Sequence, residues 1–212
     1  MTPMPSFFVP LRVSETGFNS NCVLPHNCTI DHIKRAMNDF IDFLTFINAQ
    51  LYTKEMKRFE TMIMPANFSS MVGEFMAAGI PKYCETLVKN TYNNGHPDLI
   101  PNGRYPNNAI LHGTEGIEIK ASRHSSGWQG HNPEDVWLLV FVFDSNTQAD
   151  EANNATKKPF RIVKVVGNEV KKSDWNFSGR SETSRRTITA SITRSGYEKM
   201  ERNWIYKEDN NS

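Results

Sequence analysis

The 212-residue sequence has no long hydrophobic run, few cysteines and almost no net charge. No stretch reaches the roughly 18 consecutive apolar residues of a transmembrane helix, which excludes a membrane-spanning protein. Three cysteines are too few, and odd in number, for a disulfide framework. The first thirteen residues hold three prolines and one arginine, so they lack the basic start and apolar core of a signal peptide. We therefore expect an intracellular protein.

The balance of 24 Lys and Arg against 23 Asp and Glu does not by itself indicate a nucleic-acid partner, because such proteins usually carry a basic surface. The charge is nevertheless uneven along the chain. Residues 157–194 contain ten Lys and Arg against three Asp and Glu, so this stretch carries +7 and the remainder carries −6. This asymmetry predicts a phosphate-contacting part near the C-terminus.

The first 90 residues are typical of helices. Apolar residues at intervals of three and four, from Ile33 to Leu51, predict a long helix capped by Thr29 or Asp31. The pattern continues to Pro65, which we expect to end it. The further helices are predicted at 69–78, capped by Asn67 and closed by Gly79, and at 81–90, beginning at Pro81.

From residue 95 onward, the segments are short and rich in β-branched residues, which predicts strands. The run 136–143 is apolar throughout, as expected of a central strand that is covered on both faces. A polar stretch at 146–158 predicts a surface loop. The strands are predicted at 116–122, 136–144, 160–166 and 187–193. Helices followed by strands indicate an α/β or α+β fold in a single domain.

Glu118 and Lys120 lie two residues apart in one predicted strand, so both emerge on one face while Ile117 and Ile119 emerge on the other. Charges on a covered strand are costly unless they pair or bind a metal. Asp98 adds a second carboxylate upstream. Two carboxylates suit Mg²⁺, which keeps its other coordination positions for water and a substrate phosphate.

The sequence Pro97-Asp98, followed by Glu118-Ile119-Lys120, resembles the signature of the PD-(D/E)xK nucleases, the superfamily that holds most type II restriction endonucleases. The segment 71–75, with Glu74, is similar to the acid-bearing helix that often precedes this signature. The resemblance implies a restriction-endonuclease-like core, with helices flanking a mixed central β-sheet. It also implies Mg²⁺-dependent hydrolysis of double-stranded DNA in the cytoplasm of a prokaryote.

By the same resemblance, Asp98, Glu118 and the carbonyl group of Ile119 hold Mg²⁺, and Glu74 is an outer or second-site ligand. Lys120 positions the attacking water and helps to deprotonate it. Two other acids, Glu115 and Glu85, remain alternatives for the catalytic carboxylates. The alternative functions are a structure-specific repair or resolvase nuclease on the same core, a non-catalytic DNA-binding protein, and a ligand-binding domain.

Two stretches carry side chains that suit contact with DNA. The glycine-rich segment 123–132 combines Arg, Gln and Asn, which bond base edges, with a backbone that approaches a ligand closely; alternatively, Trp128 anchors an ordinary turn in the core. The basic stretch interleaves Lys and Arg with Ser and Thr, which is typical of phosphate contacts. The predicted DNA-binding residues are Arg123, His124, Trp128, Gln129, His131, Asn132, Lys171, Lys172, Arg180, Ser181, Arg185, Arg186 and Arg194.

Two further features leave their roles open. Cys22, His26, Cys28 and His32 lie close together, but the five residues between the cysteines depart from the usual zinc spacing. The apolar stripe of 33–51 is either core packing or a dimer seam. A homodimer is expected, since two-fold symmetry places one active site on each strand of a duplex. The single nuclease domain, 1–212, is expected to comprise a helical part (1–65), a catalytic core (66–145) and a basic part (146–212).

Overall fold

The structure, a computed structural model, describes residues 3–130, 134–178 and 189–208. These residues form a mixed α+β fold with a mixed central sheet, which is the fold class that the sequence predicts. The six strands of this sheet have the order β1-β2-β3-β5-β6-β9, and a second, smaller sheet has the order β4-β8-β7. The strands of the large sheet are β1 (Leu87–Lys89), β2 (Leu99–Pro101), β3 (Ile117–Ser122), β5 (Val136–Asp144), β6 (Arg161–Val170) and β9 (Trp204–Lys207). Those of the small sheet are β4 (Gln129–Gly130), β7 (Trp175–Ser178) and β8 (Thr189–Ile192).

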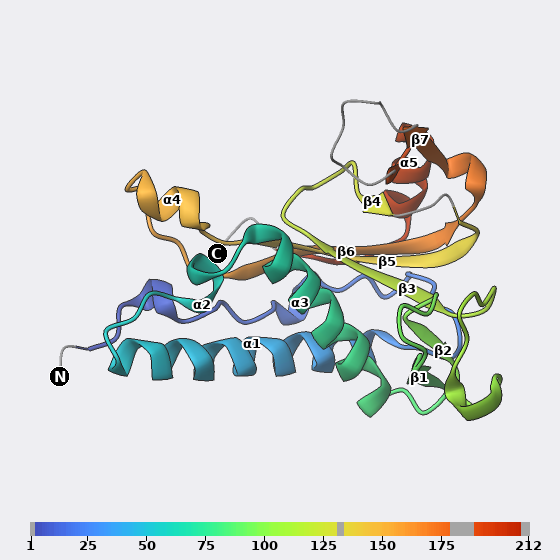
Figure 1. Ribbon diagram of the computed structural model, residues 1–212, viewed down its shortest axis with the longest axis horizontal. Coiled ribbons are helices and arrows are strands. Elements are labelled where there is room, and N and C mark those ends of the chain that lie inside the picture. Colours follow the sequence, from blue (N-terminus) through green and yellow to red (C-terminus); the bar gives the residue numbers. More distant parts are fainter. Residues whose placement is uncertain (1–2, 131–133, 179–188, 209–212) are drawn as a thin grey trace.

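Each face of the large sheet has its own cover (Figure 1). The helices α1 (Ile30–Thr53) and α3 (Pro65–Gly79) lie on one face, and the small sheet and α5 (Arg194–Arg202) lie on the other. The central strand β5 divides its side chains accordingly. Leu139 and Phe141 enter the core beneath the helices, whereas Leu138 and Val140 enter the core beneath the small sheet. The expectation of a central strand covered on both faces is confirmed.

The long helix α1 begins where the sequence predicts. The side chain of Thr29 accepts a hydrogen bond from the amide of His32, and the His32 ring accepts one from the amide of Thr29. These bonds satisfy two amides that a helix start leaves without partners. The apolar residues of the first three turns, Ile33, Met37 and Phe40, are fully buried in the core of the same chain. Here the stripe is therefore core packing.

The helical pattern does not run on to Pro65, contrary to prediction. α1 ends at Thr53, and Glu55 takes a left-handed conformation with φ of 55°. A short helix, α2 (Phe59–Met62), follows. Pro65 then begins α3 instead of ending a helix, because the first helical turn needs no amide donor from that residue. Asn67 consequently lies inside α3 and is not its cap.

The prediction of a helix at 81–90 is also wrong. Only a 3₁₀ turn forms, at Ile80–Lys82, and the chain then enters β1. There Val88 pairs with Ile100 of β2. The proline suits a first helical turn, but the backbone beyond it gains partners from a strand that is distant in sequence. This change places the segment 89–98 against the sheet.

The remaining differences are small. The stretch 146–158 contains a short helix, α4 (Gln148–Ala152), as well as loop, and β6 continues four residues beyond its predicted end. β8 lies within the predicted strand 187–193, and Ala190 and Ile192 are buried as the alternation predicts. Residues 187 and 188 lie outside the described part. No helix in the described residues has the length and apolar character to cross a membrane.

Candidate active site

Asp98 lies where β2 and β3 separate. These two strands are antiparallel and pair at Leu99 and Ile117. Next to this pair, the backbone amide of Ile119 donates a hydrogen bond to Asp98 Oδ2 at 2.7 Å. The carboxylate is thus held by β3, the strand that carries Glu118 and Lys120.

Gly116 permits this close approach of the two strands. Its φ is 139°, and a Cβ atom at this position would lie only 2.1 Å from the carbonyl oxygen of Leu99. Any other residue would be strained in this conformation and would push β2 away from β3. The glycine therefore helps to set the distance between Asp98 and β3.

Glu118 and Lys120 emerge on the same side of β3, as the sequence predicts. Ile117 and Ile119 are buried on the other side. The ammonium group of Lys120 forms an ion pair with Glu118 Oε1, and the other carboxylate oxygen, Oε2, is hydrogen-bonded to His96 Nδ1 at 3.0 Å. Both oxygens of Glu118 are therefore positioned by neighbouring cationic or polar groups.

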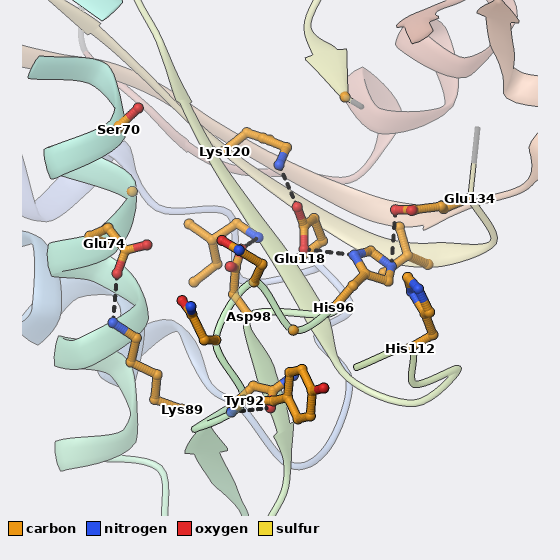
Figure 2. A pocket seen from close by; sticks show the side chains of 18 of the residues that line it. Ser70, Glu74, Lys89, Tyr92, His96, Asp98, His112, Glu118, Lys120 and Glu134 are labelled. Atoms are coloured by element: carbon orange, nitrogen blue, oxygen red, sulfur yellow. Dashed lines mark hydrogen bonds and ion pairs between the residues drawn. The ribbon is translucent and has the colours of Figure 1, made fainter. Parts of the chain in front are cut away.

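His96, just before Pro97, joins two carboxylates (Figure 2). Its Nδ1 faces Glu118, and its Nε2 lies 3.1 Å from Glu134 Oε2, at ion-pair distance but without hydrogen-bond geometry. Burial alone lowers the pKa of His96, but the hydrogen bond and charge of Glu118 outweigh it and leave the pKa raised. The ring therefore holds its second proton more readily than an exposed histidine and keeps Glu118 in place.

A cavity of about 840 Å³ brings these side chains together. Its walls come from α3, the segment 89–98, β3 and the chain around the small sheet. Figure 2 shows Asp98 and Glu118 between α3 on one side and His96 with Glu134 on the other. The charged residues of the lining are the carboxylates of Glu74, Asp98, Glu118 and Glu134 and the ammonium groups of Lys89 and Lys120. This excess of carboxylates favours a bound cation.

The two predicted catalytic carboxylates, Asp98 and Glu118, differ in protonation. Burial raises the pKa of Asp98 to about 7, and the charge of Glu118 adds to the rise. Burial acts on Glu118 in the same direction, but the hydrogen bond from His96 and the charge of Lys120 outweigh it and lower its pKa to about 2. At neutral pH Glu118 is therefore ionised, while Asp98 is only partly so.

This donor set fits Mg²⁺. Asp98 and Glu118 offer hard oxygen ligands, and the raised pKa of Asp98 marks a carboxylate that lacks a neighbouring positive charge strong enough to offset its burial. A divalent cation would favour the ionised form of Asp98. The carbonyl of Ile119, the third predicted ligand, belongs to the residue whose amide holds Asp98. The residues of the cavity are thus suited to the ion that the sequence predicts.

Lys120 is an ammonium group in this arrangement. Burial alone lowers its pKa, but the charge and hydrogen bond of Glu118 outweigh this effect and leave the pKa raised. A general base needs the opposite shift. The raised pKa therefore suits a Lys120 that orients a water molecule and stabilises negative charge. Removal of a proton from water by Lys120 would require a change in its surroundings.

Glu74 lines the cavity from α3, as expected of an outer ligand, but it differs from the other two acids. Its side chain is 65% exposed and forms an ion pair with Lys89 at 2.6 Å. The alternative acids lie elsewhere: Glu115 is partly exposed and paired with Arg104, and Glu85 is exposed. Neither of these two residues lines the cavity.

Asn90 holds the segment that carries His96 and Asp98. Its side-chain amide nitrogen donates to the carbonyls of Pro97 and Ile110, and its side-chain oxygen accepts from the amide of Ile110. Its backbone amide donates to the carbonyl of Asp98. The side chain is buried, so these bonds form out of contact with water. Asn90 therefore fixes the backbone on which two site residues stand.

The predicted recognition loop is divided between core and surface. Trp128 is only 3% exposed, belongs to the core beneath the small sheet and donates to the carbonyl of His124. Arg123 is half-buried and donates to the carbonyl of Ser145. His124 and Gln129 are exposed. Trp128 therefore anchors the turn in the core, as in the alternative interpretation of this segment. Its exposed neighbours, His124 and Gln129, form part of the loop surface.

Ion pairs occupy much of the basic stretch. Of its seven described cations, Lys158, Arg161, Lys164, Lys171 and Arg194 pair with acidic residues. Lys172 is exposed and its ammonium group has no acidic partner among the described residues. The other predicted DNA-binding residues, His131, Asn132, Arg180, Ser181, Arg185 and Arg186, lie outside the described part of the chain. The formal charge of +7 therefore overstates the free positive charge of this stretch.

Sequence reasoning missed His96, Glu134 and Asn90. His96 immediately precedes the recognised Pro97-Asp98 pair, so its position next to the motif was an available signal. The role of Glu134 had no such signal, because it meets His96 only through the fold. Asn90 fell in a segment that was expected to be helical.

A comparison with protein-family models gives no match to the chain, and a comparison with curated proteins gives none either.

Proposed function

We propose that the protein is a Mg²⁺-dependent endonuclease of the type II restriction class, which hydrolyses phosphodiester bonds in double-stranded DNA. The observation that carries this proposal is the convergence of Asp98, Glu118 and Lys120 on one cavity whose lining has more carboxylates than ammonium groups. Mg²⁺ brings a phosphate into such a cavity because it offsets the repulsion between the carboxylates and the phosphate oxygens.

The order of the elements also supports the proposal. The acid-bearing helix α3, the acid before β2, the Glu-x-Lys strand β3 and the buried strand β5 follow one another in the order that the PD-(D/E)xK resemblance implies. β3 and β5 are parallel, with Glu118 opposite Leu138. This order favours a restriction-endonuclease-like core. A homodimer follows from the proposal, since a symmetric duplex site has one scissile bond on each strand.

Each residue then has a defined task. Asp98, Glu118 and the carbonyl of Ile119 would hold Mg²⁺, which supplies charge stabilisation for the phosphate and a water of lowered pKa. His96 keeps Glu118 ionised and oriented. Lys120 donates from its ammonium group to the water or to a phosphate oxygen that becomes more negative in the transition state.

The direct test is incubation of the full chain with long linear duplex DNA and Mg²⁺. Discrete fragments are expected; a smear would indicate a nonspecific nuclease, and preferential cutting of branched DNA a repair or resolvase enzyme. Lys120→Ala should abolish cleavage. Lys34→Ala is a matched control, because Lys34 has almost the same side-chain exposure, 27% against 28%, and pairs with Glu15 outside the cavity. DNA that stays intact across metals and salt concentrations would refute the proposal.

Glu74→Gln should slow cleavage by about 10- to 100-fold, the usual effect of losing an outer-shell group. It should not abolish cleavage, because Glu74 is exposed and already paired with Lys89. The measurement is the initial rate of fragment formation at saturating Mg²⁺. Glu85→Gln, on an exposed acid outside the cavity, should retain the full rate. A larger loss for Glu85→Gln than for Glu74→Gln would contradict this assignment of the acids.

Lys172→Ala should weaken DNA binding and reduce the slope of log affinity against log salt by about one, since one phosphate contact is lost. Lys172 lies near Trp175, which lines the cavity. Lys171→Ala is the neighbouring control, because Lys171 is already paired with Glu169. Binding can be measured in Ca²⁺ by fluorescence anisotropy, and equal slopes for wild type and Lys172→Ala would remove Lys172 from the DNA-contacting surface.

A further inference from the structure

A second group of metal-ligating side chains lies away from the cavity. Cys28, His32 and Cys84 come together, and their potential ligand atoms all lie within 4.8 Å of one another. Cys28 precedes the helix α1, His32 is in its first turn, and Cys84 follows the 3₁₀ turn Ile80–Lys82. Sequence spacing alone could not find this group, because Cys84 follows α3 in the chain and comes close to Cys28 and His32 only through the fold.

The group has the composition of a zinc site. Thiolates and imidazoles are the ligands that Zn²⁺ prefers, whereas Mg²⁺ takes oxygen ligands. In a tetrahedral zinc site with bonds of about 2.3 Å to sulfur, ligand atoms are roughly 3.8 Å apart. The observed spacing therefore requires an inward movement of about 1 Å at most. Rotation of the cysteine and histidine side chains can supply most of this movement.

The remaining thiol of the chain, that of Cys22, lies outside this group of three. Cys22 is partly buried against the same hydrophobic core. The three thiols are free of disulfides. Structural zinc sites close with four protein ligands, so Cys22 would have to move toward the other three residues to take the fourth position.

We propose that Cys28, His32 and Cys84, with Cys22 as the fourth ligand, bind one structural Zn²⁺ ion per chain. The site is independent of the proposed Mg²⁺ site, because none of its residues lines the active-site cavity. It joins the start of α1 to the segment that leads from α3 into β1. Figure 1 shows these elements next to one another, at the end of α1 nearer to β1 and β2.

Metal binding would change one bond of the helix cap. His32 Nδ1 now accepts a hydrogen bond from the amide of Thr29 at 3.2 Å. Coordination through Nδ1 takes the lone pair that accepts this bond, and coordination through Nε2 requires a proton on Nδ1. In either case that bond is lost. The other half of the cap, from the amide of His32 to Thr29 Oγ1, is unaffected. The helix start is then held by the metal as well as by Thr29.

The test is titration of the reduced, metal-free full chain with Co²⁺ and then Zn²⁺. One equivalent of Co²⁺ should give the intense visible absorption of a tetrahedral, thiolate-ligated ion, and one equivalent of Zn²⁺ should remove it. Bound Zn²⁺ should also protect the thiols from alkylation and raise the melting temperature of the wild-type protein. None of these measurements depends on cleavage, so the site can fail while the proposed nuclease function holds.

The variants identify the ligands. Cys84→Ser and His32→Gln should lose stoichiometric binding, whereas His26→Gln, a control on a neighbouring histidine outside the group, should retain it. Cys22→Ser should keep one ion per chain but bind it at least tenfold more weakly. Circular dichroism checks that each variant is folded. Absence of tetrahedral Co²⁺ absorption in the wild type, or binding that survives Cys84→Ser, would overturn the site. The site would also be overturned if Cys28 and Cys84 formed a disulfide and the protein still took up no metal after this disulfide was reduced.

Discussion

Asp98→Asn is expected to abolish cleavage and, at the same time, to stabilise the metal-free protein above pH 7. Asn cannot supply the negative charge that Mg²⁺ needs, so the cleavage rate should fall by at least roughly a hundredfold. Its side-chain oxygen can still accept the hydrogen bond from the amide of Ile119. The fold of the site is therefore preserved while its affinity for the ion is lost.

The gain in stability follows from the titration of Asp98. Its pKa is raised from 3.8 to about 7 on folding, so the protonated form is favoured in the folded chain. The stabilising contribution is complete below pH 3.8 and is lost as the pH rises through about 7. The amide introduced by Asp98→Asn carries no charge at any pH, so the melting temperatures of variant and wild type should diverge as the pH rises from 3.8 to about 7 and keep a constant difference above that. The difference should be about 2–4 °C per kcal/mol for a chain of this size.

Mg²⁺ provides the control for this result. The ion should raise the melting temperature of the wild type at pH 8 and leave that of Asp98→Asn almost unchanged, since only the wild type has the ionised carboxylate pair. Differential scanning calorimetry with and without Mg²⁺ measures both effects. A variant that is less stable than the metal-free wild type at pH 8 would show that Asp98 is not under electrostatic strain in this cavity.

Arg58→Ala is expected to lower the free energy of unfolding by about 3–5 kcal/mol, the usual cost of leaving a buried charge without its partner. The guanidinium group is 1% exposed and donates to the carbonyls of Phe7 and Lys158 and to the side chain of Asn146. It also lies 3.2 Å from Glu60, whose pKa is raised because the carboxylate is buried. Its loss would leave that acid and two carbonyls without their main partner.

Chemical denaturation measures this cost, and two variants interpret it. Arg12→Ala removes an exposed ion pair with Asp42 and should cost less than about 1 kcal/mol. The double variant Arg58→Met, Glu60→Gln should cost less than Arg58→Ala, because the fully buried Glu60 no longer carries a charge without a partner, and only Glu151, 3.7 Å from Arg58, loses its ion pair. If Arg58→Ala unfolds at the same denaturant concentration as Arg12→Ala, the buried network does not contribute as its geometry indicates.

The fold was predictable where local sequence decides it. The helix α1 has a capping residue and a continuous apolar stripe. In β3, buried and partly exposed residues alternate at the start of the strand, and β5 is an apolar run that is covered on both faces. Prediction failed at 81–90, where Pro81 suggests a helix but pairing with β2 decides the structure. The burial of Arg58 could not be predicted either, because its partners come from three separate segments of the chain.

The site divides in the same way. Asp98, Glu118 and Lys120 stand in a short motif whose strand alternation places two of them on one face. His96 and Glu134 act only because the fold brings together the segments that precede β2 and β5, and no local pattern records that contact. The approach of Cys84 to Cys28 and His32 is equally non-local.

The walls of the cavity have a consequence for the synthesis of the protein. They include Ser69 on α3 and Trp175 in the small sheet, so most of the chain must leave the ribosome before the cavity can close. A nascent chain that ends before the small sheet has Asp98, Glu118 and Lys120 but lacks one side of their enclosure. With the proposed activity, the enzyme would therefore become able to cut DNA only late in translation, after both hydrophobic cores have formed.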